Sequence, residues 1–239
     1  MNKTLTITGA SSEIGTAIMR HLDASCDLML LHCSSNRDRL EKAAEQLSTP
    51  YEILCADFSD DQALTDFCTR IGKSDVLINA AAVTRTDLLP MLDDDDIQSM
   101  LRVNIFSLIK ICQAVLPYMF SRRKGVIVNI SSVAASRGNR GQTVYGGTKG
   151  FVESFSRSLA SEAGARQIRV NCIAPGPIEA GSLKTLLAYA GDEISTSLLS
   201  KRLGTPDDVA SLVRYLCSEE AEFIMGQVIG VDGGFMRGV

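Results

Sequence analysis

Tyr145 and Lys149 stand four residues apart, a spacing that puts both side chains on one face of a helix. A neighbouring ammonium group favours the phenolate and would lower the pKa of the phenol from about 10 toward neutrality. A phenol adjusted in this way is a usable general acid, so the pair predicts a proton transfer at Tyr145. Gly146 and Gly147 lie between them and predict a close approach to another segment, with ordinary helix packing as the alternative.

A glycine-containing turn, residues 8–15, follows the first apolar run and opens a helix. Such a turn lets backbone N–H groups approach a pyrophosphate at a helix N-terminus. We therefore predict a dinucleotide site, with contacts from Gly9, Ser11, Ser12, Ile14 and Gly15.

The residues after the second apolar run bear on the choice between NADPH and NADH. NAD-binding turns usually have an acid about 20 residues after the glycines, where it bonds the ribose 2′-hydroxyl. Here the corresponding segment, residues 32–37, has no acid. Ser34, Ser35 and Arg37 could instead bind a 2′-phosphate, which a carboxylate would repel. The sequence favours NADPH; the alternative is that Arg37 only begins a solvated helix face.

Seven short apolar runs alternate with longer helical patterns. They are Thr4–Thr8, Leu28–His32, Tyr51–Cys55, Val76–Ala80, Val126–Ile130, Ile168–Ile173 and Val228–Val231. Such runs are typical of a parallel sheet buried on both faces, and their alternation with helices implies βαβ units. We predict an α/β fold: a single Rossmann-type, doubly wound parallel sheet of about seven strands with helices on both faces. Residues 1–239 would form one dinucleotide-binding and catalytic domain.

Three longer segments would frame the site. A helix is predicted from Ile97 to about Phe120, preceded by four acids that complement its dipole. Asn104 lies on the apolar stripe of this helix, so it is either a satisfied structural amide or, as we favour, part of the site. A second helix is predicted between the N-cap residue Thr205 and about Leu216. The polar stretch over residues 180–200 is predicted to be a substrate lid.

The composition argues against several classes of protein. The 239-residue chain carries a net charge of -4, two His and seven Cys. We expect no nucleic-acid partner, because the chain lacks a basic balance, and no metal or His-based triad. The odd, widely spaced cysteines favour reduced core thiols in a reducing compartment. No apolar run approaches the roughly 18 residues of a membrane span and no signal peptide is evident, so we expect a cytoplasmic protein without a membrane partner.

Together these motifs resemble the short-chain dehydrogenase/reductase family over the whole chain. The matching positions, in the family's order and spacing, are the turn over residues 8–15, Asp57, Asn79, Asn104, Asn129 to Ser132, Tyr145, Lys149, Pro175-Gly176 and Val231 to Gly234.

The resemblance implies a role for each position. Tyr145 would protonate the substrate carbonyl as hydride arrives, and Lys149 would lower the pKa of Tyr145 and bond the nicotinamide ribose. Ser132 would bond the same carbonyl and stabilise the developing oxyanion. Asn104 would hold a water that passes protons through Lys149. Tyr145 would also contact the cofactor. The remaining cofactor contacts would be Asp57 at the adenine with Phe58 beside it, Asn79, Pro175, Gly176, and Ile178 near the nicotinamide carboxamide.

Within the family, the chain is most similar to the 3-oxoacyl-(acyl-carrier-protein) reductases, at residues 139–142, 202–206 and 226–234. That similarity implies NADPH-dependent reduction of a 3-oxoacyl group on an acyl carrier protein, by a homotetramer. Basic side chains match those said to dock the acidic carrier, namely Arg122, Arg123, Arg166 and Arg169. A basic helix C-terminus, which any helix can have, is the alternative.

Three residues depart from the family's pattern. Glu13 replaces a glycine and brings a carboxylate near the phosphates, Ala80 replaces an amide under the cofactor, and Ala180 stands where a Thr is common. These changes bear on cofactor affinity and suggest a specialised fatty-acid or polyketide-type pathway. Two other functions are open: a reductase or dehydrogenase of a free ketone or secondary alcohol, and a weakly active scaffold subunit of a biosynthetic complex.

Overall fold

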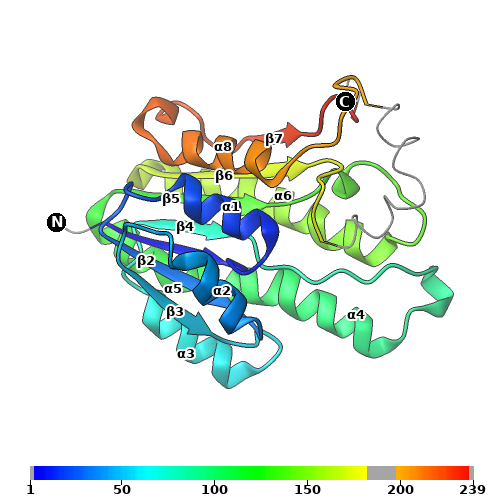
Figure 1. Ribbon diagram of the computed structural model, residues 1–239, viewed down its shortest axis with the longest axis horizontal. Coiled ribbons are helices and arrows are strands. Elements are labelled where there is room, and N and C mark those ends of the chain that lie inside the picture. The colour runs from blue at the N-terminus through cyan, green and yellow to red at the C-terminus, as the bar shows by residue number, and fades with distance from the viewer. Residues whose placement is uncertain (1–2, 182–197, 237–239) are drawn as a thin grey trace.

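The computed structural model describes residues 3–181 and 198–236. Within them the chain forms a seven-stranded parallel sheet in the order β3-β2-β1-β4-β5-β6-β7 (Figure 1). The strands are β1 (Thr4–Thr8), β2 (Leu28–Cys33), β3 (Tyr51–Cys55), β4 (Val76–Asn79), β5 (Gly125–Ile130), β6 (Ile168–Pro175) and β7 (Val228–Val231). The predicted fold class is confirmed, and every predicted strand is present with its ends within two residues of the expected positions.

Helices cover both faces of the sheet. On one face lie α1 (Glu13–His21), α2 (Arg37–Ala44) and α8 (Pro206–Cys217), and on the other lie α3 (Asp61–Ile71), α5 (Ser107–Arg122) and α6 (Thr143–Ala163). Figure 1 shows α1 and α8 side by side. Each face has its own apolar core because side chains alternate along a strand. In β2, Met29 and Leu31 point into the first core and Leu30 into the second.

The carboxyl ends of the parallel strands meet at one edge of the sheet. There Thr8, Asn79, Asn129 and Cys172 form a row across β1, β4, β5 and β6. The chain winds outward in opposite directions from β1 and β4, and ligands bind at such a switch point in doubly wound sheets. The fold therefore places the predicted site residues at this edge.

The helix predicted from Ile97 to Phe120 is longer than expected and contains an irregular turn. It begins with α4 (Asp94–Leu101), whose N-terminus is capped by the Asp93 carboxylate, 2.8 Å from the backbone N of Asp96. A π-helical turn over residues 102–106 then joins it to α5. A π turn holds one more residue than an α turn and is frequent at functional sites. Asn104 is the central residue of this turn.

The same helix is the most apolar one that the structure describes. It spans residues 94–122, and an 18-residue window within it has a mean hydropathy of 1.5, enough for a membrane span by length and composition alone. Polar residues such as Asn104 and Lys110 interrupt it, so the prediction that no uninterrupted apolar run reaches this length is not contradicted. Core packing accounts for the apolar face, because Ile111, Val115 and Met119 are buried beneath the sheet.

The predicted start of the second helix is confirmed. Thr205 Oγ1 accepts from the backbone N of Asp208, and the Asp208 carboxylate accepts from the backbone N of Thr205 at 2.7 Å. This reciprocal capping box fixes where α8 begins. Most of the predicted lid, residues 182–197, lies outside the described residues.

Candidate active site

Ser132 and Tyr145 come together where β5 ends and α6 begins. Ser132 caps a short 3-10 helix, η3 (Val133–Ala135), by accepting from the backbone N of Ala134 at 3.2 Å. Gly146 lets α6 lie against this helix, because a Cβ there would be 2.7 Å from the carbonyl oxygen of Ala134. The predicted close approach is therefore found at Gly146, whereas a Cβ at Gly147 would meet nothing within 4 Å.

Lys149 was expected to lower the pKa of Tyr145, and the structure does not show this effect. Burial raises the pKa of Tyr145, and the neighbouring Ser132 hydroxyl opposes that shift by lowering it. Lys149 Nζ instead donates to the carbonyl oxygen of Ile130 at 2.9 Å and lies 5.7 Å from the centre of the Tyr145 ring. The protonated phenol is thus the favoured form, which suits a proton donor.

Lys149 is itself strongly affected by its surroundings. Its side chain is 4% exposed, and this burial lowers its pKa to about 8, although Cys172 acts in the opposite direction. A lysine with this pKa can gain and lose a proton near neutral pH. Lys149 therefore has the chemistry of a proton relay at the base of the site.

Asn104 lies beside Lys149, but its amide is already engaged. Oδ1 accepts from the backbone N of Val83 at 2.8 Å, and Nδ2 donates to the carbonyl oxygen of Val83 and to Thr148 Oγ1. Both open interpretations thus have support: the amide is satisfied within the protein, and the residue lines the site. Asn104, Lys149 and Asn79 border a cavity of about 10 Å³. That volume is near the minimum for one water.

The side chain of Asn79 points beneath the sheet edge, not out toward the nucleotide turn. Nδ2 donates to Asn129 Oδ1 at 2.8 Å, and Asn129 Nδ2 in turn donates to Ser156 Oγ at 2.8 Å. Asn79 Oδ1 is buried and has no protein partner. The predicted role of Asn79 in cofactor binding stays a prediction, and the structure shows that the residue borders the water-sized cavity.

The glycine turn has the shape required for close approach of a phosphate. Gly9 has a positive φ of 67°, and a Cβ there would lie 2.8 Å from Ala81. A Cβ at Gly15 would lie 2.2 Å from the carbonyl oxygen of Gly9. Ser12 caps α1 by accepting from the backbone N of Gly15 at 3.0 Å and donates to the Gly9 carbonyl oxygen. Its hydroxyl is thus used inside the turn, and the turn together with the helix N-terminus fits a dinucleotide.

Glu13 crosses from this turn to the segment after β6. Its Oε2 accepts from the backbone N of Gly181 at 2.6 Å. The residue that replaces the family's glycine therefore joins the two walls of the predicted pyrophosphate site, and it brings a negative charge to them.

At the predicted adenine end, Ser34, Ser35 and Arg37 are exposed just beyond β2. Arg37 Nε donates to Glu41 at 2.7 Å. Asp57 is exposed, and bonds from Ser59 lower its pKa. These groups are placed where a nucleotide can reach them, and Arg37 and Asp57 each have a local partner that they would have to share or leave.

Phe58 and His32 lie in the core behind these exposed groups. The Phe58 ring stacks on His32 at 3.9 Å between ring centres, and the residue is 2% exposed, so its side chain is part of the core. His32 was missed by the sequence reasoning, although it is a polar residue inside an apolar strand. Its Nδ1 accepts from the backbone N of Gly9 at 3.1 Å, and Nε2 bonds the carbonyl oxygen of Ala56 at 2.9 Å. This buried imidazole holds the glycine turn to the end of β3.

On the predicted nicotinamide side, the residues after β6 shape the site mainly through their backbone. Gly176 bonds Val231 and leaves no room for a Cβ, which would lie 2.6 Å from Asp232. Pro175, the last residue of β6, pairs with Val231. The Ile178 side chain is 5% exposed and packs into the first core. The predicted contact of Ile178 with the cofactor stays a prediction, and the core packing of its side chain argues against a side-chain contact.

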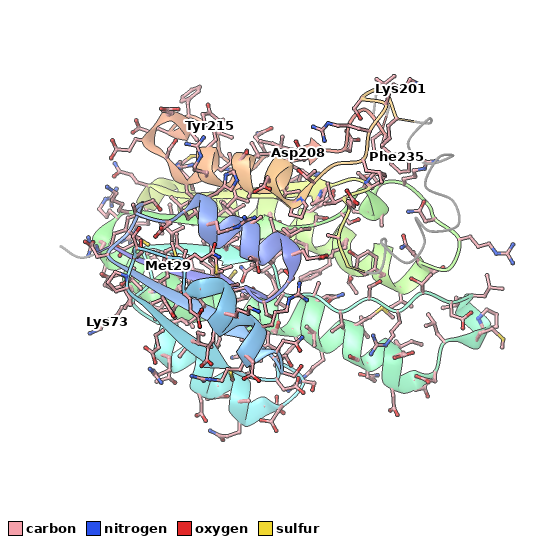
Figure 2. All side chains as sticks on the ribbon, in the orientation of Figure 1. Met29, Lys73, Lys201, Asp208, Tyr215 and Phe235 are labelled. Atoms are coloured by element: carbon pink, nitrogen blue, oxygen red, sulfur yellow. The ribbon has the colours of Figure 1, made fainter. Side chains whose placement is uncertain are left out.

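The predicted carrier-docking residues lie at the other edge of the sheet. Arg122 and Arg123 directly precede β5, and Arg166 precedes β6, whereas Tyr145 lies beyond the carboxyl ends of these strands. The 21-residue helix α6 separates Tyr145 from Arg166 by about 30 Å. Figure 2 shows the same separation through Lys73, just before β4, and Phe235, just after β7, at opposite ends of the molecule.

Arg169 corrects the prediction outright. It lies in β6, is 7% exposed, and donates to the carbonyl oxygen of Ser218 at 3.1 Å. A carrier protein cannot reach it. Arg123 also makes an internal bond, to the carbonyl oxygen of Ala165, but its side chain stays at the surface.

Known proteins are similar to this chain in sequence and in fold. The family model described as Enoyl-(Acyl carrier protein) reductase matches residues 9–236. The 3-oxoacyl-(acyl-carrier-protein) reductase FabG of Thermotoga maritima is 34% identical over 240 residues, covering 98% of each chain. A structure titled short chain dehydrogenase/reductase family protein has a TM-score of 0.90 at 29% identity, covering 98% of this chain and 97% of its own. The structure of ElxO with NADP bound has a TM-score of 0.90 at 27% identity, covering 99% of both chains.

Proposed function

The chain belongs to the short-chain dehydrogenase/reductase family, and from this premise we propose that it reduces a 3-oxoacyl group on an acyl carrier protein to the 3-hydroxyacyl form with NADPH. It is an oxidoreductase with a nicotinamide cofactor. The observation that carries the substrate class is the placement of the Tyr145 hydroxyl beside that of Ser132, a pair suited to receive a carbonyl oxygen.

The chain's own residues would handle the proton and the oxyanion. NADPH, when bound, supplies the hydride. Tyr145 gives its proton to the carbonyl oxygen, and the Ser132 hydroxyl donates a hydrogen bond to the same oxygen as charge develops on it. Lys149, with a pKa of about 8, can then restore the proton of Tyr145 and be recharged from the cavity that it shares with Asn104.

The preference for NADPH rests on the adenine end. The segment after β2 carries exposed Ser34, Ser35 and Arg37 and no carboxylate before Asp38. A 2′-phosphate accepts charge-assisted bonds from such groups. The NADP-bound structure with the same fold supports this choice.

On a single chain, the residues proposed to dock the carrier protein lie far from Tyr145, where the acyl group would have to be placed. Arg122, Arg123 and Arg166 could serve the site of a second copy, which agrees with the proposed homotetramer. Similarity to a FabG protein supports the carrier as substrate partner. The departures at Glu13, Ala80 and Ala180 are our grounds for proposing a specialised pathway.

Initial rates on matched substrates test this proposal. The same 3-oxoacyl group is presented on acyl carrier protein and as a small free thioester, with NADPH in both reactions. We expect kcat/KM to be higher on the carrier, and Arg123→Glu and Arg166→Glu to remove only that advantage. Equal rates on both forms would favour the free-ketone reductase. NADPH binding without turnover of either would favour the scaffold subunit.

A further inference from the structure

Two thiols meet at the sheet end that borders the predicted 2′-phosphate contacts. Cys33 is the last residue of β2, Cys55 is the last residue of β3, and the parallel register pairs them directly. Their Sγ atoms are 3.4 Å apart. Neighbouring strands lie about 4.8 Å apart, inside the Cα–Cα range of about 4.4–6.8 Å that a disulfide spans. A small local shift would therefore allow the two sulfurs to bond.

The pair has one accessible member and one buried member. Cys55 is exposed and Cys33 is buried, so a reagent in solution reaches the pair through Cys55. The Arg37 guanidinium donates to Cys55 Sγ at 3.7 Å. Reactive cysteines commonly have such a cationic neighbour, because the thiolate is the nucleophile. Burial is the main cause that raises the pKa of Cys33 to about 12, so the exposed Cys55 and not Cys33 is suited to the first step of an exchange.

Both thiols are continuous with the predicted nucleotide contacts. Ser34 and Ser35 follow Cys33 in the chain, and Asp57 follows Cys55 after one residue. The backbone N of Ala56 also donates to the carbonyl oxygen of Cys33 at 3.0 Å. A bond between the sulfurs would shift these strand ends and take away the sulfur that accepts from Arg37. The chemistry at the thiols and the binding at the nucleotide end are therefore coupled through the same few residues.

We propose that Cys33 and Cys55 form a reversible intrachain disulfide, and that this bond weakens binding of the 2′-phosphate end of the nucleotide. The second half rests on the proposed NADPH function; the first half does not. The oxidant is a low-molecular-weight disulfide such as glutathione disulfide.

The exchange takes two steps. Cys55 Sγ loses its proton to water and attacks one sulfur of the oxidant, which releases one thiolate. Cys33 Sγ then loses its proton to water and attacks Cys55 Sγ, which releases the second thiolate. Two protein thiols are oxidised to one disulfide, and the oxidant is reduced to two thiols.

Peptide mass mapping of the whole chain after treatment with glutathione disulfide tests the bond. We expect a cross-linked peptide that holds Cys33 and Cys55, with the loss of two hydrogens, and its reversal by dithiothreitol. Cys33→Ser should stop at a mixed disulfide on Cys55, and Cys55→Ser should form neither product at this site. Cys68→Ser, a half-buried cysteine on α3, is the control and should cross-link like the wild type. Glutathione retained on Cys55 in the wild type, or a cross-link between other cysteines, would overturn the proposal.

NADPH titration of the reduced and the cross-linked protein tests the coupling. We expect the Kd to rise at least about fivefold on oxidation, the lower range of typical coupling between sites, and to recover with reductant. Cys33→Ser should show no such cross-link-dependent change. An unchanged Kd in fully cross-linked protein would overturn the coupling and leave the disulfide standing. Failure of the reduced protein to bind NADPH would instead overturn the proposed function, and the coupling with it.

Discussion

The catalytic end and the adenine end of the site are built differently, although both lie at the carboxyl edge of one sheet. Lys149 and Asn104 are buried and bond groups at least 19 residues away in the chain. Arg37 and Asp57 are exposed, and their bonds to Glu41 and Ser59 are local. The one other bond given for Arg37, to Cys55 Sγ on the neighbouring strand, is long at 3.7 Å. The whole fold thus fixes the catalytic groups, whereas the adenine-end groups can change partners at small cost. Cofactor choice and redox control are expected to reside at the second end.

The largest effect is expected at the catalytic end. Tyr145→Phe removes the proton donor and keeps the ring, so kcat should fall by about 10²- to 10⁴-fold, the usual contribution of general acid catalysis. NADPH binding, measured by fluorescence titration, should stay within a factor of about two, because the phenol oxygen meets the substrate. A kcat within tenfold of the wild type would show that another group supplies the proton.

His32 sharpens the comparison, because it belongs to the nucleotide end but is buried like the catalytic end. Burial lowers its pKa from 6.5 to about 4. The folded protein therefore binds fewer protons than the unfolded chain between these values, so stability is full above pH 6.5 and falls as the pH drops toward 4. The loss attributable to this residue is about 3 kcal/mol. A protonated Nδ1 would also lose its bond from Gly9.

Urea unfolding from pH 7 to pH 4 measures this loss. His32→Asn keeps a side-chain acceptor for Gly9 but does not titrate, so it should lack the His32 part of the pH dependence. Groups that do not interact with His32 titrate alike in both proteins and cancel in the difference, whereas Asp57 interacts electrostatically with His32 and belongs to the His32 effect. Parallel curves for the wild type and His32→Asn would mean that His32 is not held neutral by the fold.

Arg37 should affect the cofactor more than the chemistry. Arg37→Ala should weaken NADPH binding by about tenfold or more, as expected for a lost charge-assisted bond, and leave NADH binding nearly unchanged. Arg39→Ala is the matched control, since Arg39 is exposed two residues further along α2. Equal losses for NADPH and NADH would place Arg37 outside the 2′-phosphate site.

The smallest effect is expected at Glu13. Glu13→Gln keeps an acceptor for the backbone N of Gly181 and removes the negative charge beside the glycine turn. NADPH should bind about threefold more tightly, a value in the range for a partly screened charge pair. Titration at low and high salt should show the gain shrinking as salt rises. Weaker binding in the variant would mean that the carboxylate helps to form the site.

The sequence predicted the strands well, because burial of the sheet on both faces requires continuous apolar runs. The strands are short continuous apolar runs, a pattern typical of parallel strands buried on both faces, so their ends were predicted closely. The row of site residues follows from the same fact, because parallel strands deliver their carboxyl ends to one edge. Gly146 was expected to allow a close approach, and the contact with η3 explains why a side chain does not fit.

The sequence could not supply the directions of side chains or the contacts between strands. The inward turn of Asn79 depends on the bond to Asn129, and the meeting of Cys33 with Cys55 depends on strand register. The π turn places Asn104 where its amide bonds Val83 across a loop, a contact between segments far apart in the chain. Arg169 is different, because it lies inside a run that we predicted to be a buried strand, and its burial could have been inferred.

Transfer of an isotopic label tests the central claim most directly. NADPH that carries deuterium at the transferable position of nicotinamide C4 is supplied with a 3-oxoacyl carrier protein, and the product is examined by mass spectrometry. The account predicts a 3-hydroxyacyl product with one deuterium at C3, and almost none from Tyr145→Phe. An unlabelled product, or no product from a protein that binds NADPH, would contradict it.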